Sequence, residues 1–158
     1  MNPDPARAYR ESAVRGASPV GLVVLLFEEA LRSVCKAQRA LRENNIERRA
    51  LELTHAVEVI GYLQSTLDFE KGGEVARNLS HFYDVARAKI LEANIRADDS
   101  MLEWLASQLS GHIDSWQQVD RELTSSEAET LPPSLGPAMA EASGRRARAM
   151  PQGARVRR

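Results

Sequence analysis

Apolar residues recur at alternating steps of four and three along most of this chain, which places them on one face of an α-helix. The first run follows Ser18 and Pro19, a capping hydroxyl and then a proline at the first helical position, where its missing N–H costs nothing. The stripe is broad, which indicates an inner member of a helical bundle. It comprises Val23, Phe27, Ala30, Val34, Ala37 and Leu41.

Three further stripes follow, and each is preceded by a helix boundary signal. Asn44 with Glu47 has the spacing of a capping box, and the second helix is expected to end at Lys71-Gly72-Gly73. The third helix is expected from about Glu74, and Ser100 with Glu103 predicts the start of the fourth. The three stripes comprise Ile46, Ala50, Leu53, Val57, Ile60, Gln64 and Leu67, then Val75, Leu79, Phe82, Ala86, Ile90 and Ala93, and finally Leu102, Leu105, Leu109, Ile113, Trp116 and Leu123.

The stripes predict an all-α fold, an antiparallel up-down four-helix bundle with short connectors. We expect a mobile N-terminal segment with a short helix over 1–16, the bundle over 17–124, and a disordered tail over 125–158 that is rich in proline and arginine. A solvated tail is the plainest interpretation of the arginines, and contact with an acidic partner, RNA or a membrane remains open. Gly61, inside the second stripe, is expected to mark a close helix contact.

Composition fits a soluble helical domain, with 43% hydrophobic, 27% charged and 5% aromatic residues in 158. The net charge of -1 provides no electrostatic reason for the chain as a whole to bind nucleic acid. No signal peptide and no apolar run of membrane-spanning length is found, so we expect a cytoplasmic protein without membrane insertion. Cys35 is the single cysteine, so no internal disulfide is possible, and we expect it to be a small buried apolar residue.

Catalytic and cofactor signals are weak. Glu52 and His55 form one E-x-x-H, whereas a dimetal bundle site needs a second copy and two further glutamates. His55 is therefore expected at the surface, and a metal-binding bundle enzyme is kept as the rival hypothesis. No phosphate-binding glycine loop and no nucleophile beside a base is recognisable, so we expect no cofactor, no metal and no enzymatic activity.

The apolar side chains exceed what a minimal core needs, and a bundle with wide stripes can expose a groove between its helices. Such a groove binds the apolar face of a partner's amphipathic segment. The residues in question are Phe27, Leu31, Leu63, Leu67, Leu79, Tyr83 and Trp116.

Two segments resemble a known family, the flagellar secretion chaperones called FliS. The segment from Leu67 to Leu79, LDFEKGGEVARNL, is similar to the family signature L-D-x-E-x-G-G-E-I-A-x-N-L. Tyr9, Ser18-Pro19 and the run LLFEEALR from Leu25 resemble the family's opening, an S-P pair before an L-x-x-x-L-Y-D-G type helix. The resemblance extends from about Tyr9 to Leu123.

The resemblance implies an export chaperone that binds the disordered C-terminal region of flagellin, prevents its premature polymerisation and aids type III secretion. It also implies contact with components of the flagellar export apparatus, and it leaves the oligomeric state open. Tyr9 corresponds to a tyrosine that covers the groove when flagellin is absent. The groove residues expected on this basis are Tyr9, Phe27, Leu31, Ile60, Leu63, Leu67, Asn78, Leu79 and Tyr83.

Three positions near the first helix depart from the family pattern. Phe27 stands where tyrosine is usual, Glu28 where aspartate is usual, and Glu29 where glycine is usual. A divergent flagellin, or a second FliS-like copy with another client, is compatible with these changes. A scaffold or regulator that binds a different protein through the same groove is the remaining alternative.

Overall fold

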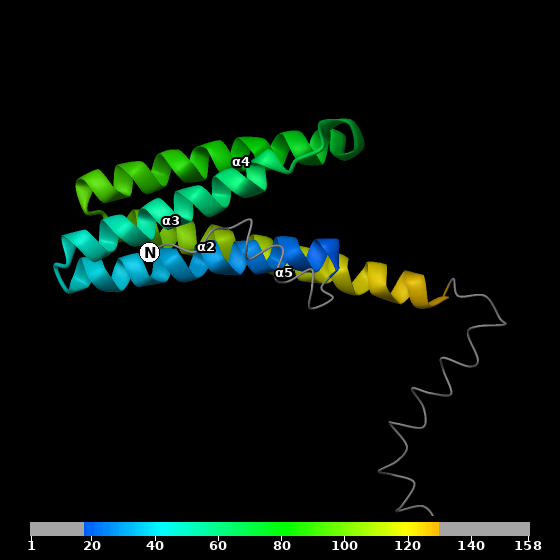
Figure 1. The fold of residues 1–158 in the computed structure, drawn as a ribbon, viewed down its shortest axis with the longest axis horizontal. Helices are drawn as coiled ribbons and strands as arrows, with labels where there is room; N and C mark the ends of the chain where they lie inside the picture. The colour runs from blue at the N-terminus through cyan, green and yellow to red at the C-terminus, as the bar shows by residue number, and fades with distance from the viewer. Residues whose placement is uncertain (1–17, 130–158) are drawn as a thin grey trace, which may run out of the picture. The chain divides into compact units, whose positions relative to one another are not determined.

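The computed structural model describes residues 18–129, and the surroundings of their side chains as far as residue 127. The helices in this range are α2 (Pro19–Arg42), α3 (Ile46–Ser65), α4 (Phe69–Arg96) and α5 (Asp99–Glu129) (Figure 1). No strand occurs among these residues, so the predicted all-helical bundle is confirmed. The expected N-terminal helical segment and most of the expected tail lie outside the described residues, while α5 continues past Ser125. The chain divides into two compact units after Asp120, and the fold below concerns the first.

Polar contacts show that neighbouring helices of this first unit run antiparallel. Arg49, near the start of α3, donates from Nε to Asn94 Oδ1 near the end of α4, over 3.1 Å. Gln38 Nε2, late in α2, donates to Asp99 Oδ1 at the start of α5, also over 3.1 Å. Because α2 and α3 are joined by a short connector, the helices alternate up and down, as the connector lengths predict (Figure 1).

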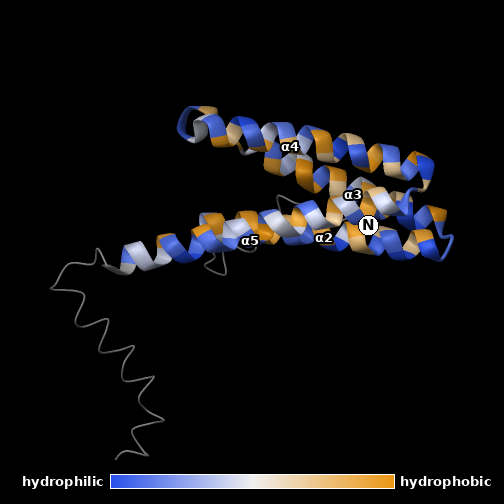
Figure 2. Ribbon diagram, turned by 180° about the vertical axis from the view of Figure 1, so that it is seen from behind, coloured by the Kyte–Doolittle hydropathy of each residue, from blue (hydrophilic) through white to orange (hydrophobic). Residues whose placement is uncertain are grey.

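The core consists mainly of aliphatic side chains, and most of them belong to the four predicted stripes. Ala56, Val59, Leu63 and Tyr83 are core residues outside those stripes. Ile46, Val75 and Leu123 were expected on the buried faces but are exposed, so the stripes are wrong at these positions. Apolar and polar positions alternate around each helix in the way that a helix with one buried face requires (Figure 2). Burial of a large aliphatic side chain contributes about 1.5–3 kcal/mol, so these residues supply most of the stabilisation. The core includes Phe27, Ala30, Val34, Leu53, Ala56, Val59, Ile60, Leu63, Tyr83, Ala86, Ile90, Ala93, Leu102, Leu105, Leu109 and Ile113.

Helix starts follow the expected chemistry at α2 but not at α3. Ser18 Oγ accepts a hydrogen bond from the Gly21 N–H over 2.9 Å, which confirms Ser18 as the cap before Pro19. At α3 the cap is Asn45, whose Oδ1 accepts from the Arg48 N–H, so the hypothesis that Asn44 caps this helix is wrong. Asn44 instead takes a left-handed conformation, with φ of 57°, in the connector.

The two later helices also begin earlier than predicted. The Asp68 carboxylate accepts from the N–H groups of Glu70 and Lys71, so α4 begins at Phe69 and not near Glu74. Consequently Gly72 and Gly73 do not end the previous helix, and Gly73 interrupts α4 with a φ of 50°. At α5 the Asp98 carboxylate accepts from the Met101 N–H, which places Ser100 inside the helix. The predicted S-x-x-E capping box was therefore wrong.

Two further sequence hypotheses are wrong. A Cβ atom added at Gly61 would meet nothing within 4 Å, so no close helix contact explains that glycine. Cys35 is exposed and not buried. It follows the buried Val34, and successive helical residues point about 100° apart, so Cys35 falls outside the α2 stripe.

Candidate partner-binding groove

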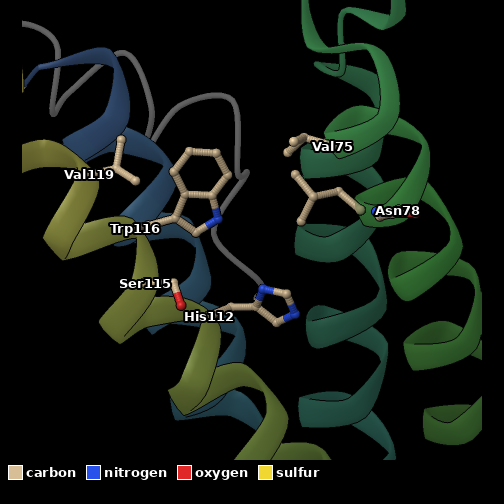
Figure 3. A pocket seen from close by; sticks show the side chains of 7 residues that line it. Val75, Asn78, His112, Ser115, Trp116 and Val119 are labelled. Atoms are coloured by element: carbon tan, nitrogen blue, oxygen red, sulfur yellow. The ribbon is translucent and has the colours of Figure 1, made fainter.

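A pocket of about 340 Å³ lies between α4 and α5. We call it the α4–α5 pocket. Trp116 and His112 of α5 point toward the helix that carries Val75 and Asn78 (Figure 3). Its volume falls in the range of about 300–1,000 Å³ that is typical of binding sites. It is lined by Val75, Asn78, Leu79, His112, Ser115, Trp116 and Val119.

A second pocket, of about 310 Å³, adjoins the first. We call it the bundle-end pocket, because it lies where α3 meets α4. Val75, Leu79 and Trp116 line both pockets, so the two form one continuous depression, which we call the groove. A pocket between α3 and α4 is only about 140 Å³. The bundle-end pocket is lined by Val23, Leu63, Thr66, Leu67, Asp68, Lys71, Gly72, Val75, Ala76, Leu79, Tyr83 and Trp116.

The groove presents apolar side chains to solvent. Val75 is 62% exposed and Val119 is 38% exposed, although both belong to apolar types that a core normally buries. Leu79 and Trp116 are partly buried and pack against the core, so they form a preordered floor. Contiguous exposed apolar surface is a common feature of sites where proteins bind other molecules, so the groove is the candidate site.

His112 is the titratable residue of the α4–α5 pocket. Its ring stacks on Phe27 with centroids 5.4 Å apart and contacts Phe82 with centroids 4.2 Å apart. Burial against these rings lowers the pKa of His112 below its ordinary value, because the charged imidazolium is poorly solvated there. The ring is therefore neutral at pH 7 and adds no charge to the groove.

Tyr83 fixes the inner wall of the bundle-end pocket. Its ring lies 6.0 Å from that of Phe27 and 5.9 Å from that of Phe82, and the residue is almost fully buried. Burial raises the pKa of the Tyr83 phenol well above its ordinary value, so the group stays protonated. These aromatic contacts are tilted, the arrangement that aromatic rings favour.

The groove contains part of the residue set expected from the sequence. Leu63, Leu67, Asn78, Leu79 and Tyr83 line it. Phe27 and Ile60 are fully buried in the core, and Leu31 is partly buried against the core without lining either pocket. Tyr9 lies outside the described residues.

Several groove residues were not included in the expected set. Val75 is expected only as part of a helix stripe. Trp116 is among the surplus apolar residues that a groove could expose, but it is absent from the groove set that the family resemblance implies. His112 precedes Trp116 by one helical turn, so the i, i+4 spacing was the available signal for it. The other groove residues that were not expected are Val23, Thr66, Asp68, Lys71, Gly72, Ala76, Ser115 and Val119.

The proposed E-x-x-H metal site does not assemble. His55 is only 3% exposed, so the expectation of a surface histidine was wrong, and its Nε2 lies 3.0 Å from Glu29 Oε1. Glu52 pairs instead with Arg48 over 2.8 Å. Within the described part of the chain, no group of three or more His, Cys, Asp and Glu residues is arranged to hold a metal ion.

None of the helices described here combines the length and the apolar character that a bilayer crossing requires. The fold and the groove define a small helical bundle with an apolar depression on its surface.

The chain belongs to the FliS family of flagellar secretion chaperones. The family model described as "Flagellar protein FliS" matches residues 1–123, which is most of the chain. The flagellar secretion chaperone FliS of Salmonella typhimurium is 36% identical over 115 residues, covering 72% of this chain and 85% of that protein. The chaperone FliSB of Pseudomonas aeruginosa is 31% identical, covering 69% of this chain and 86% of that protein. FliS of Campylobacter jejuni is 30% identical, with coverage of 74% and 91%. These relatives are named chaperones, so the chain is a secretion chaperone and not an enzyme.

Proposed function

We propose that the groove binds the C-terminal region of flagellin in the cytoplasm and keeps it from polymerising before type III export. The observation that carries this proposal is the continuous apolar depression around Val75, Leu79 and Trp116, in a chain of the FliS family. An amphipathic segment of the client lies along the groove and buries its own apolar face there.

The energetics of such a complex allow the client to be released for export as well as protected from polymerisation. A client segment that is unfolded when free pays the entropic cost of ordering when it binds, which lowers the affinity per unit of buried area. The groove floor is already ordered by the core, so most of that cost falls on the client. The complex is therefore specific but can release its client at the export apparatus.

The proposal is tested with purified chaperone and a peptide of the C-terminal region of flagellin from the same organism. Calorimetry measures the affinity, and circular dichroism measures the helix that the peptide gains. The Trp116→Ala variant removes the side chain shared by both pockets, and a buried aromatic anchor of this kind is worth about 2 kcal/mol or more, a loss of about 30-fold in affinity.

Trp104→Ala is the matched control, because Trp104 is also on α5 and is 41% exposed but lines neither pocket. We expect it to bind the peptide like the unmodified chaperone. Absence of heat and of helix gain with the unmodified protein would reject the proposed client. An equal loss in both tryptophan variants would reject the groove as its site.

A further inference from the structure

The α4–α5 pocket contains polar groups among its apolar walls. The imidazole nitrogens of His112, the side-chain amide of Asn78 and the indole N–H of Trp116 all belong to its lining. None of the three makes a hydrogen bond to another residue in the described part of the chain. Ser115 differs, since its hydroxyl donates to the Gly111 carbonyl over 3.1 Å. A client that covers this pocket removes water from three groups that then need new partners.

We propose that the α4–α5 pocket selects a client segment that places an uncharged amide side chain, Asn or Gln, beside His112 and Asn78. This inference rests on the proposed function, and it names the chemistry that the groove recognises within an otherwise apolar contact. The amide has two N–H donors and a carbonyl acceptor. It therefore complements the neutral imidazole, which donates at one nitrogen and accepts at the other, and the indole, which only donates.

A charged anchor does not fit this pocket. No Lys, Arg, Asp or Glu lines it, and the His112 ring is held between Phe27 and Phe82 in its neutral form. A carboxylate or ammonium buried there loses its water without gaining an opposite charge. A wholly apolar anchor fits the walls but leaves the polar groups unpaired, which costs about tenfold in affinity for each group that loses its water.

The bundle-end pocket has a different lining and takes a different anchor. Leu63, Ala76 and Tyr83 make its wall apolar, while Asp68 and Lys71 stand at one side, and the Asp68 carboxylate is already used as the cap of α4. An aliphatic side chain of the client suits this pocket. Because the pockets share three lining residues, the aliphatic and the amide residues lie three or four positions apart on one helix of the client.

The test is a double-mutant cycle between chaperone and client peptide. Each Asn of the flagellin peptide is replaced by Leu and each Gln by Met, which keeps side-chain size, and binding is measured by calorimetry. One such replacement is expected to weaken binding to the unmodified chaperone by about tenfold. The same replacement is expected to change the affinity less than about twofold when the chaperone carries Asn78→Leu and His112→Phe together, because the hydrogen bonds to these two side chains are then missing with either peptide.

Controls separate this inference from the proposed function. His112→Phe keeps an aromatic ring against Phe27, and thermal unfolding shows whether the fold is kept. Gln108→Leu introduces the same kind of change on α5 outside both pockets and is expected to leave the tenfold effect intact. If the peptide binds and Trp116→Ala weakens it, but no amide replacement does, the amide inference fails while the proposed function stands. If the unmodified peptide does not bind at all, both are overturned.

Discussion

His55 of α3 and Glu29 of α2 are joined by a contact of 3.0 Å between His55 Nε2 and Glu29 Oε1. The histidine is nearly inaccessible to solvent, whereas Glu29 is partly exposed and also pairs with Arg32. Glu29 stands where the FliS motif has glycine, and the contact gives this departure a structural reason. The chain has a buried imidazole at the α2–α3 interface, and the glutamate supplies its hydrogen-bond partner.

Replacement of Glu29 by alanine is expected to lower the free energy of unfolding by about 1–3 kcal/mol, the cost of leaving a buried polar group without its partner. The His55 Nδ1 atom is buried and makes no hydrogen bond within the described residues, and the Glu58 carboxylate, 4.0 Å from it, is too distant to replace the lost hydrogen bond. Urea denaturation measures the change. Glu28→Ala, one position earlier on the same helix, is the control and should change stability by less than about 0.5 kcal/mol. Equal effects of the two substitutions would contradict the structural role of the Glu29–His55 contact.

Stability is expected to fall on mild acidification because of His112. Burial lowers the pKa of its imidazole in the folded protein, while the unfolded chain takes up a proton near the ordinary value of about 6.5. Between these two pKa values the unfolded state binds more protons, so the free energy of unfolding decreases as the pH falls below about 6.5. The decrease stops below the folded-state pKa.

This effect is isolated by comparing variants across about pH 7.5 to pH 5 in urea denaturation. His112→Phe should show a smaller loss of stability on acidification than the unmodified chain, since it has no proton to take up at this position. His81→Asn, at an exposed position of α4, should keep the loss attributed to His112. Parallel pH profiles for His112→Phe and the unmodified chain would show that another group is responsible.

Most of the core could be predicted from the stripes because burial on a helix depends on a spacing that the sequence displays directly. The exceptions, such as the exposed Ile46 and the buried Val59, arise because the spacing does not say how wide the buried face is or where it ends. The first residues of the helices were harder to predict than the core. Asn44 and Asn45 are both suitable caps, and only the backbone conformation shows that Asn45 is the cap of α3. The caps Asp68 and Asp98 were not predicted, because the glycine pair at Gly72 and the S-x-x-E spacing at Ser100 gave stronger sequence signals a few residues later. The groove was the least predictable part. Whether Val75 is buried or exposed depends on how far α4 stands from α5, and no local pattern contains that distance.

Ala97 ends α4 in the left-handed conformation, with φ of 54° and ψ of 48°. An L-residue is strained there and glycine is not, so Ala97→Gly is expected to raise the free energy of unfolding by about 0.5–1 kcal/mol. Ala88→Gly makes the same chemical change at an exposed position inside α4, where it should lower stability by about 1 kcal/mol. Denaturation of both variants should therefore give opposite signs. A loss of stability in both would mean that Ala97 is not held in the left-handed region.

Gly73 links the cap of α4 to the groove, and its replacement is expected to affect both. With φ of 50° and ψ of −124°, it occupies a region that side chains with a Cβ avoid, at a cost of about 1–3 kcal/mol. In Gly73→Ala the backbone either keeps this strained conformation or becomes helical at residue 73. A helical residue 73 would move the first turn of α4, which carries Lys71 and Gly72, out of its present position in the lining of the bundle-end pocket. Gly61→Ala provides the contrast, because open space and helical geometry there predict a gain of about 1 kcal/mol. Peptide affinity then distinguishes a purely local strain from a reshaped groove. We expect Gly73→Ala to weaken flagellin peptide binding by more than the smaller fraction of folded protein explains. Normal affinity with reduced stability would show that the groove tolerates a straighter α4.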